Sequence, residues 1–337
     1  MPYAPPEALL VVRSAEVAEQ IEGNRETVQD IVRDAYLTHA RGDSSLPHSS
    51  FLRFPDRERD RIIALPGYLG GRFRVSGVKW IASFPGNITH GLARASAVLL
   101  LNDARTGFPY ACLESSLISA ARTAGSATLA AEELIGGRRA GRVGFVGTGL
   151  IAEHIRRFLT ELGWEIGGYR LFDTDPAAAE RFAQTLRETG SPDVRAVGDV
   201  REAFSACDLV ILATVAGTPH LADPQLLRHA PVVLHVSLRD LDPALIAAAQ
   251  NVTDDIGHVV RERTSLHLAA ERFGHQDFID GTLADVLTGG FTRDPGRAVV
   301  FSPFGLGVLD LAVGKHVYDR VAGLGGGSPV AGFFPAG

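Results

Sequence analysis

Lysine is nearly absent from this chain of 337 residues: it occurs only at Lys79 and Lys315, and arginine supplies the remaining positive charge. Acidic residues outnumber basic ones and give a net charge of −6, so the sequence offers no reason to expect a nucleic-acid partner. Because so few lysines remain, each one is a stronger candidate for a specific role. Lys79 stands out because it interrupts the apolar run VSGVKWIASF.

Cysteine is also scarce. Cys112 and Cys207 lie in apolar segments, and we expect buried free thiols in a reducing compartment rather than a disulfide or a metal site. The 11 histidines lack the spacing of metal ligands, so no metal is predicted. We expect His235, His258 and His267 to form hydrogen bonds within the structure or in a pocket.

Long apolar runs are missing as well. No run approaches the roughly 18 residues that suggest a membrane-spanning helix, and the first residues do not resemble a signal peptide. With 45% hydrophobic residues, the chain is expected to be a folded, globular, cytoplasmic protein. Its length is typical of two domains.

A glycine-rich turn is the most informative motif that is present. Residues 142–152 read RVGFVGTGLIA, in which a short apolar strand leads into a G-x-G-x-x-A turn and then into a helical pattern. The first glycine permits the tight turn, the second lets a pyrophosphate approach the backbone, and the small third residue lets helix and strand pack closely. The helix N-terminus would hold the phosphates. The turn residues expected to bind a dinucleotide are Gly147, Thr148, Gly149, Leu150 and Ile151.

Asp173 supports this interpretation. It ends a second apolar strand, 24 positions after Gly149 (173 − 149), where an acid accepts hydrogen bonds from the ribose hydroxyls of adenosine. The residues that follow read TDP, with no arginine to receive a 2′-phosphate, and Arg170 is expected to point away. NAD is therefore favoured over NADP. A glycine turn in another kind of α/β protein is the alternative.

Apolar patterns predict an α/β fold. In the first part of the chain we expect strands at 61–69, 75–84, 95–103 and 108–114, a hairpin turn at 104–107, and helices after Asn24, as a cap, and over 116–134. Strands then alternate with helices, which is typical of a doubly wound parallel sheet of Rossmann type. These strands are expected near 143–146, 169–173, 194–197, 208–213, 232–237 and 251–254.

The C-terminal segment is expected to return to the first domain. A helix around 306–321 has an apolar stripe that would pack there, and the glycine-rich tail from 325 is expected to be mobile. We therefore assign residues 1–125 with 312–337 to an α+β substrate domain, and residues 126–311 to a Rossmann-type dinucleotide-binding domain.

Two predicted strands end in residues that could meet a ligand, because ligands of such sheets bind beyond the carboxyl ends of the strands. The strand at 208–213 leads into small residues that begin with Thr214 and would let a cofactor lie close. The strand at 232–237 leads to Asp240, which would lie near the nicotinamide edge, within reach of a substrate nitrogen or a water. On position alone, a surface aspartate in a turn, or a cap of the helix near Asp242, is an equal alternative.

Four cations in the first domain need a partner, because they interrupt apolar or loop segments: Arg53, Lys79, Arg94 and Arg122. A substrate with several carboxylates would satisfy them, since the guanidinium group suits bidentate recognition of a carboxylate. Internal ion pairs with Glu114 or Asp103 are the alternative. Arg53 lies in a loop-like segment, and its exact role stays open.

These residues resemble those of the ornithine cyclodeaminase/mu-crystallin superfamily over nearly the full chain. The resemblance rests on Lys79 in its strand and on the segments LLLNDARTGFPYACLE, ISAARTAGSATLAAEEL, GTGLIA and FSPFGLGVLDLA. It implies a homodimeric, NAD(H)-dependent protein whose first domain binds substrate and dimerises. It also implies that Lys79, which we count as catalytic too, and Arg122 hold the substrate carboxylate, and that Asp240 is the proton shuttle or water activator. Further cofactor contacts are expected from Thr123, Thr214, Ser237 and Leu238.

Two segments depart from the ornithine cyclodeaminases. Those enzymes continue from the catalytic aspartate with PGKTEL, whereas LDPAL follows Asp240, and they carry Gly-Leu-Pro where this chain has GLAR, which ends at Arg94. The segments SFPGNITHGLARASAV and HVSLRDLDP look like the branch that makes 2,3-diaminopropionate for siderophores and peptide antibiotics. Members of that branch oxidise N-(2-amino-2-carboxyethyl)-L-glutamate with NAD and hydrolyse the imine to 2-oxoglutarate and L-2,3-diaminopropionate.

That substrate carries three carboxylates, which would provide anionic partners for the four cations. Ornithine carries one carboxylate and a second cation, which the cluster should repel. The alternatives are another amino-acid or imine dehydrogenase or a cyclodeaminase of the same fold, and a mu-crystallin-like protein that binds dinucleotide and a small ligand without turnover.

Overall fold

The computed structural model describes residues 7–335. The chain divides into two compact units, Met1–Arg122 with Leu306–Gly337, and Thr123–Gly305. The first boundary lies within helix α3 (Ser116–Ile135), and the second lies just before helix α11 (Gly307–Gly323). The boundaries expected from the sequence lie three and six residues further along (125 − 122 and 311 − 305). A boundary before α11 keeps that whole helix in the first unit.

The first unit is built on an eight-stranded sheet in the order β18-β1-β7-β6-β5-β4-β2, with β3 paired to β4. Its pairs are antiparallel except for β1 with β7. The strands are β1 (Ala8–Val12), β2 (Ser44–Ser45), β3 (Ser50–Phe54), β4 (Arg57–Leu69), β5 (Val75–Ser83), β6 (Ala95–Asn102), β7 (Pro109–Glu114) and β18 (Ser328–Ala331). The four predicted strands and their hairpin are confirmed. The mobile tail is a correction, because β18 lies within it and pairs with β1.

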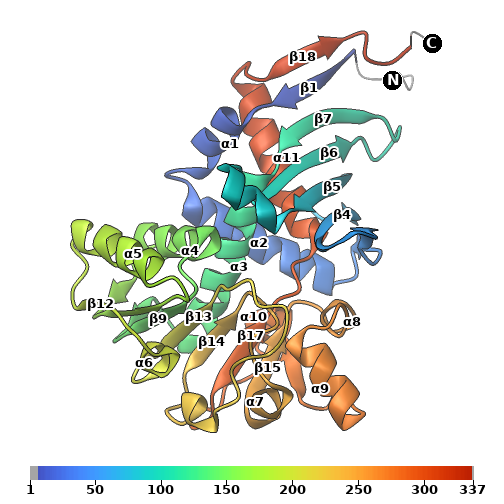
Figure 1. The fold of residues 1–337 in the computed structure, drawn as a ribbon. Coiled ribbons are helices and arrows are strands. Elements are labelled where there is room, and N and C mark those ends of the chain that lie inside the picture. Colours follow the sequence, from blue (N-terminus) through green and yellow to red (C-terminus); the bar gives the residue numbers. More distant parts are fainter. Residues whose placement is uncertain (1–6, 336–337) are drawn as a thin grey trace. The chain divides into compact units, whose positions relative to one another are not determined.

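Helix α11 covers one face of this sheet and contacts β4, β5 and β6 (Figure 1). The packing is close: a Cβ atom on Gly314 would lie 2.1 Å from Cδ2 of Leu99. Alternation along the strands puts Lys79, the partner of Leu99 in register, on this inner face. The predicted return of the C-terminal helix to the N-terminal residues is confirmed.

The other helices of the first unit are α1 (Ser14–Ile21), α2 (Arg25–Ala40) and the short 3-10 helix η1 (Pro85–His90). Helix α2 begins after Asn24, as predicted, and its apolar stripe is buried. Asn24 is the N-cap residue, as predicted, but its side chain makes no capping hydrogen bond. Its Nδ2 donates instead to the carbonyl of Glu22 at 3.3 Å.

The second unit contains a parallel sheet in the order β12-β11-β9-β13-β14-β17-β15-β16. Its strands are β9 (Val143–Val146), β11 (Tyr169–Phe172), β12 (Val194–Ala196), β13 (Leu209–Leu212), β14 (Val232–His235), β15 (Gln250–Thr253), β16 (Ile279–Thr282) and β17 (Val299–Ser302), and a separate pair is formed by β8 (Arg139–Ala140) and β10 (Glu165–Ile166). The order reverses between β9 and β13, which is the switch point where doubly wound sheets bind ligands. The Rossmann-type prediction is confirmed, although β16 and the central β17 were not anticipated.

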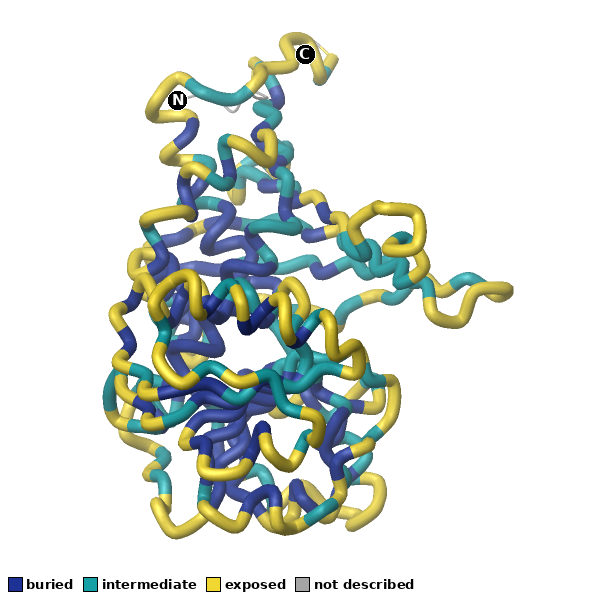
Figure 2. The backbone as a smooth tube through the Cα atoms, turned by 60° about the vertical axis from the view of Figure 1, so that its left-hand side comes forward, coloured by how far each residue is buried: buried dark blue, intermediate teal, exposed yellow. Residues whose placement is uncertain are grey.

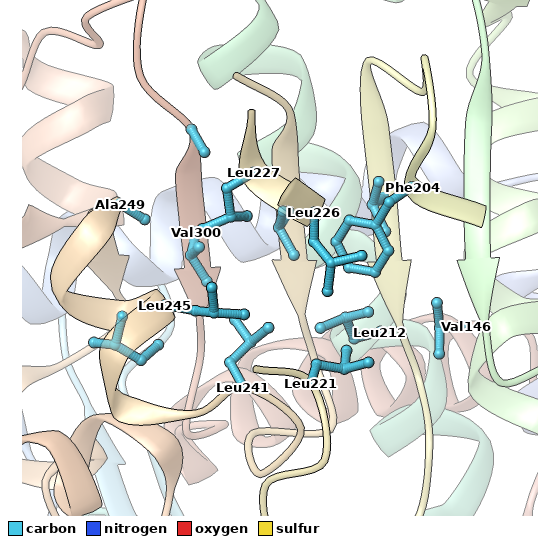
Figure 3. Packing of buried hydrophobic residues seen from close by; sticks show 14 of the residues in the cluster. Val146, Phe204, Leu212, Leu221, Leu226, Leu227, Leu241, Leu245, Ala249 and Val300 are labelled. Carbon is cyan, nitrogen blue, oxygen red and sulfur yellow. The ribbon is translucent and has the colours of Figure 1, made fainter. Parts of the chain in front are cut away.

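Helices connect these strands: α4 (Leu150–Glu161), α5 (Pro176–Glu188), α6 (Val200–Phe204), η2 (Pro224–Leu227), α7 (Pro243–Ala248), α8 (Ile256–Val259), α9 (Ser265–Phe273) and α10 (Leu283–Thr288). Every residue of β9, β13, β14, β15 and β17 is buried, as the dark blue strands in Figure 2 show. Figure 3 shows apolar side chains packed on the sheet, including Leu212, Leu241 and Val300. Within residues 7–335, no helix is both long and apolar enough to span a membrane.

The two cysteines differ in burial. Cys207 is buried, as expected, and packs in the apolar cluster of the second unit. Cys112 is only half-buried, which corrects the expectation. It lies on β7 in a position that alternates with the buried Ala111 and Leu113, so its side chain is on the sheet face away from α11.

Candidate functional site

The glycine turn joins β9 to α4 and leaves open space in front of the helix. Gly147 has φ +87°, and a Cβ atom there would lie 2.6 Å from the carbonyl oxygen of Ala213, so the fold itself requires glycine. A Cβ atom on Gly149 would meet nothing within 4 Å. Packing therefore does not explain the second glycine, whereas a pyrophosphate lying against the N-terminus of α4 does. Leu150 begins α4 and is 66% exposed.

Asp173 follows β11 and lies beside this turn. Its Oδ2 accepts hydrogen bonds from the backbone N of Thr148 at 2.8 Å and from the Thr148 hydroxyl at 2.9 Å, and Oδ1 accepts from the backbone N of Asp175 at 3.0 Å. Burial works to raise the pKa of the Asp173 carboxyl, but the hydrogen bonds from Asp175 and Thr148 outweigh it and lower the pKa. Asp173 is therefore an ionised acceptor at the predicted position.

Arg170 lies away from Asp173. Its guanidinium donates to Oδ2 of Asp193 at 2.8 Å, and Asp193 comes just before β12, at the amino end of the strands. Asp173 lies at the carboxyl end, so the expectation that Arg170 points away is confirmed. The strand that precedes Asp173 therefore brings no arginine to this position that could receive the 2′-phosphate of NADP.

Asp240 is held in a strained turn after β14 and is completely buried. Leu238 in this turn has φ +70°, a conformation that residues other than glycine seldom adopt. A surface position for Asp240 is therefore wrong. The helix cap is also a different residue: Asp242 accepts a hydrogen bond from the backbone N of Ala244 at the start of α7.

Both carboxylate oxygens of Asp240 have several partners. Oδ1 accepts from the Thr214 hydroxyl and lies 3.0 Å from Nε2 of His220. Oδ2 accepts from the Ser237 hydroxyl and lies 3.3 Å from Nε2 of His235. Burial works to raise the pKa of Asp240, but the hydrogen bonds from the Ser237 and Thr214 hydroxyls work to lower it, and the pKa lies below its usual range. Asp240 is thus an ionised carboxylate at neutral pH.

His235 supports this cluster from inside the sheet. It is fully buried, its Nδ1 lies 3.1 Å from the Ser302 hydroxyl, and the backbone N of Asp240 donates to its Nε2 at 3.1 Å. An Nε2 that accepts this hydrogen bond carries no proton, so we favour the tautomer with the proton on Nδ1. The expectation that His235 is hydrogen-bonded is confirmed.

In the first unit, Lys79 and Arg122 share a buried partner that the sequence analysis missed. Nζ of Lys79 lies 2.7 Å from Oδ2 of Asp310 on α11, and Nε of Arg122 lies 3.3 Å from the same oxygen. The Ser119 hydroxyl lies 3.1 Å from Nζ. The alternative ion pairs with Glu114 or Asp103 are not those that Arg122 forms with Asp310, and those two carboxylates accept hydrogen bonds from their own following turns.

The charges of this cluster do not cancel. Two cations face one carboxylate, so one positive charge is left over, although Lys79 is only 2% exposed. Burial lowers the pKa of Lys79, the charge of Asp310 opposes this and the charge of Arg122 adds to it, so that the pKa falls to about 8. A second carboxylate would balance the cluster and would favour the charged form of Lys79.

A second group of cations lies on the same sheet face. Arg53 on β3 and Arg61 on β4 are directly paired in register, and Arg61 is paired in turn with Ser83 on β5. Ser83 shares its face with Lys79, four residues along β5 (83 − 79). We call Arg53, Arg61, Arg94 and Ser83 the arginine cluster. Arg61 and Ser83 were not singled out from the sequence, because only the register brings them to this place.

Arg94 is the least satisfied member of the arginine cluster. Burial lowers the pKa of its guanidinium, and the charges of Arg61 and Arg59 lower it further. Its Nε is buried without a hydrogen-bond partner in the part of the chain that the structure describes, and the same is true of the Ser83 hydroxyl. Like charges placed side by side and buried polar atoms without a partner both favour a bound anion.

The sheet order, the glycine turn and Asp173 define a protein with a Rossmann-type dinucleotide-binding fold. Residues 10–325 match the model of the ornithine cyclodeaminase/mu-crystallin family, and the chain belongs to that family. It is 29% identical over 319 residues to N-((2S)-2-amino-2-carboxyethyl)-L-glutamate dehydrogenase of Staphylococcus aureus, which covers 90% of this chain and 92% of that relative.

Solved structures share the fold. The crystal structure of CmnK has a TM-score of 0.84 and 27% identity, and covers 98% of this chain and 100% of that one. The structure of Delta(1)-pyrroline-2-carboxylate reductase from Thermococcus litoralis, in complex with NADH and L-proline, has a TM-score of 0.86 and 23% identity, and covers 96% of this chain and 100% of that one.

Proposed function

We propose that this chain is an NAD-dependent amino-acid oxidoreductase whose substrate is N-(2-amino-2-carboxyethyl)-L-glutamate. The products would be L-2,3-diaminopropionate, 2-oxoglutarate and NADH. The observation that carries the proposal is the arginine cluster on the same sheet face as Lys79. The relative from Staphylococcus aureus, named as a dehydrogenase of this compound, gives it independent support.

The spacing of the two cationic groups suits an extended substrate. Four residues along a strand correspond to roughly 13 Å. In our proposal, Lys79 and Arg122 bind one carboxylate beside Asp310, and the arginine cluster binds the carboxylates at the other end. A small amino acid such as alanine or ornithine has one carboxylate, so it would offer no partner to Nε of Arg94 or to the Ser83 hydroxyl.

The second unit would hold the cofactor. The backbone of Gly147, Thr148, Gly149, Leu150 and Ile151 fits a pyrophosphate, and Asp173 fits the ribose hydroxyls of NAD. We propose further contacts from Thr123, Thr214, Ser237 and Leu238. The bound nicotinamide supplies one thing to the chemistry, which is an acceptor for hydride. Equilibrium binding should favour NAD over NADP by at least about tenfold, and equal affinities would contradict the assignment of Asp173.

The reaction would begin with loss of hydride from the Cα atom of the glutamate part, which leaves a protonated imine. Water then adds to the imine carbon, and collapse of the carbinolamine releases the amine. The ammonium of Lys79 is suited to hold the carboxylate next to this carbon, and Asp240 supplies fixed negative charge in the second unit. The reaction thus requires three things of the protein. It needs an ion pair and a hydrogen bond to hold the substrate, and a group that accepts a proton from water.

We also propose a homodimer through the sheet face of the first unit that lies away from α11. Trp80 and Val98 are paired in register on this face and are 43% and 41% exposed. Leu52 on β3 adds a third exposed apolar side chain to the same face. Such a patch favours a protein partner, and a second copy would cover it symmetrically. Trp80→Glu should lower the mass measured by light scattering to that of a monomer, whereas Phe273→Glu in the second unit should not.

One assay tests the proposed activity. Purified protein is incubated with NAD and, in separate reactions, the tricarboxylate, ornithine, alanine and proline, and NADH absorbance is followed. The proposal expects NADH and 2-oxoglutarate from the tricarboxylate alone. Greater turnover of ornithine or alanine would replace it by another oxidoreductase of this family. Binding of NAD without turnover of any candidate would favour a mu-crystallin-like binding protein.

A further inference from the structure

We infer that His220, rather than Asp240, exchanges the proton when the imine is hydrolysed, and that Asp240 is the positioning residue behind it. This inference rests on the proposed function. His220 was not among the residues expected from the sequence. It lies in the segment that follows β13, and its side chain is 43% exposed, whereas Asp240 has no exposed surface.

The geometry separates a buried carboxylate from an accessible base. Because Asp240 is ionised and can only accept, Nε2 of His220 must donate to its Oδ1 across the 3.0 Å contact. That leaves the proton of a neutral ring on Nε2 and a free lone pair on Nδ1. No described residue makes a hydrogen bond to Nδ1 of His220. A carboxylate that fixes the tautomer of an accessible histidine is the arrangement of the serine-protease triad.

The backbone holds this pair in place. The backbone N atoms of His220 and Leu221 both donate to the carbonyl oxygen of Asp240 at 2.9 Å, and Leu221 forms a bridge with Leu241. The side chains of Leu221 and Leu241 also lie next to each other in the apolar cluster (Figure 3). The loop that carries His220 is thus fastened to the turn that carries Asp240. This holds the backbone of His220 beside Asp240.

The burial of Asp240 argues against a direct role. The Thr214 hydroxyl and His220 donate to Oδ1 and the Ser237 hydroxyl donates to Oδ2, so a substrate water would have to displace one of them. A carboxylate stabilised to this degree is also a weak base, because the efficiency of a general base rises with the affinity for the proton it must take. Histidine accepts and releases protons near neutral pH without such a penalty.

The step balances with His220 as the carrier. A C–O bond forms between water and the imine carbon, the π electrons of the C=N bond move to nitrogen, and the water proton passes to Nδ1. His220 returns this proton to the nitrogen. The C–N bond then breaks with its electrons on nitrogen, and the hydroxyl proton passes to the departing amine through the same imidazole. Iminium and water thus give ketone and ammonium ion.

Chemical rescue tests the inference. His220→Ala should lower kcat at least about 100-fold without changing NAD affinity, and added imidazole should restore part of the activity. Asp240→Asn should also lose activity, because the wrong tautomer becomes accessible, but imidazole should not restore it. His229→Ala, which removes a histidine bound to the carbonyl of Cys207, is the matched control and should leave kcat unchanged. A His220→Ala protein with kcat within about twofold of the parent, or equal rescue of both variants, would overturn the inference.

A second measurement does not need the proposed substrate. Long-range ¹H–¹⁵N NMR of the neutral His220 ring in the full-length protein should show the proton on Nε2, and Asp240→Asn should weaken that preference. A proton on Nδ1 in the parent protein would overturn the inference even if turnover is observed. Absence of NADH formation in the substrate assay would contradict only the proposed function. The NMR measurement of the His220 tautomer would still test whether Asp240 orients His220.

Discussion

Two buried carboxylates, Asp310 in the first unit and Asp240 in the second, have the same burial and very different partners. Asp310 faces the fixed cations Lys79 and Arg122. Asp240 faces two hydroxyls and the Nε2 atoms of two histidines. The first arrangement carries surplus positive charge and is suited to binding an anion. The second carries negative charge and movable protons, and is suited to proton transfer.

This contrast shows that burial alone does not indicate the role of a carboxylate. A carboxylate paired with cations inside a protein acts as a counter-charge, and its value lies in the cations that it holds in place. A carboxylate whose partners are neutral donors keeps its own charge available to orient another group. Changing each of them should therefore produce a different kind of defect.

The largest effect is expected at Asp240. Asp240→Asn is nearly isosteric but no longer fixes the tautomer of His220, so kcat should fall by roughly 10²–10⁴-fold while NAD affinity changes little. Asp242→Asn, which changes only the cap of α7, is the matched control and should keep near-normal kcat. Steady-state kinetics and fluorescence titration with NAD measure both. Normal turnover of Asp240→Asn at saturating substrate would show that Asp240, like Asp310, has no part in proton transfer.

Asp310 should matter for stability first. Asp310→Asn leaves Lys79 and Arg122 buried without their counter-charge, so the free energy of unfolding should fall by about 3–5 kcal/mol. Asp319→Asn removes a half-exposed carboxylate that pairs with Lys315, and its loss should stay below about 1 kcal/mol. Urea denaturation measures the difference. A loss at Asp310 as small as that of the control would mean that the cations are not held as a buried cluster.

Arg94 sharpens the assignment of the first unit as an anion site. Arg94→Ala should lower kcat/KM for the tricarboxylate by about 30-fold or more, because loss of one partner from a desolvated ion pair costs about 2–5 kcal/mol. Folding and NAD affinity should be unaffected. Arg139→Ala, at an exposed arginine beside Glu165, is the control. If Arg94→Ala unfolds the protein with no selective loss of substrate, Arg94 is structural.

The pH dependence of kcat/KM should reveal the charge of Lys79. Near neutral pH this is the smallest of the expected effects. The pKa of Lys79 is lowered to about 8, so the ammonium that binds carboxylate is present below pH 8 and is lost as the pH rises through that value. kcat/KM, which reports the free enzyme, should therefore fall about tenfold per pH unit above 8. Lys79→Arg should move this limb to higher pH. A profile that is flat to pH 10 would show that the charge of Lys79 is not used.

Much of the fold could be predicted because its signals are local. Alternating and continuous apolar runs marked β4–β7, β9 and β11–β15. The central strand β17 was not predicted because its three apolar residues and one serine are all buried and show no alternation, so nothing in VVFS separates a strand from a buried helical segment. Asn24 was correctly placed at the N-cap, but its capping hydrogen bond is not formed, because an asparagine side chain can satisfy neighbouring backbone groups in more than one way.

The candidate site divides in the same manner. Lys79, Arg122, Asp173 and the glycine turn could be recognised because each conflicts with, or completes, a pattern within its own segment. Asp310, which lies 231 positions from Lys79, could not, since it is one aspartate in an apolar helix until that helix packs on the sheet. Arg61 needed the strand register.

The sequence by itself determined the class of fold, the dinucleotide turn and the presence of cations within apolar segments, because these follow from residue type and short spacing. Only the tertiary structure decided that Asp240 is enclosed and that His220 reaches solvent. The physical reason is that a side chain's charge state and accessibility depend on what surrounds it, and its surroundings come from distant segments. The chemical role of a residue is therefore assigned from its contacts with distant segments of the chain.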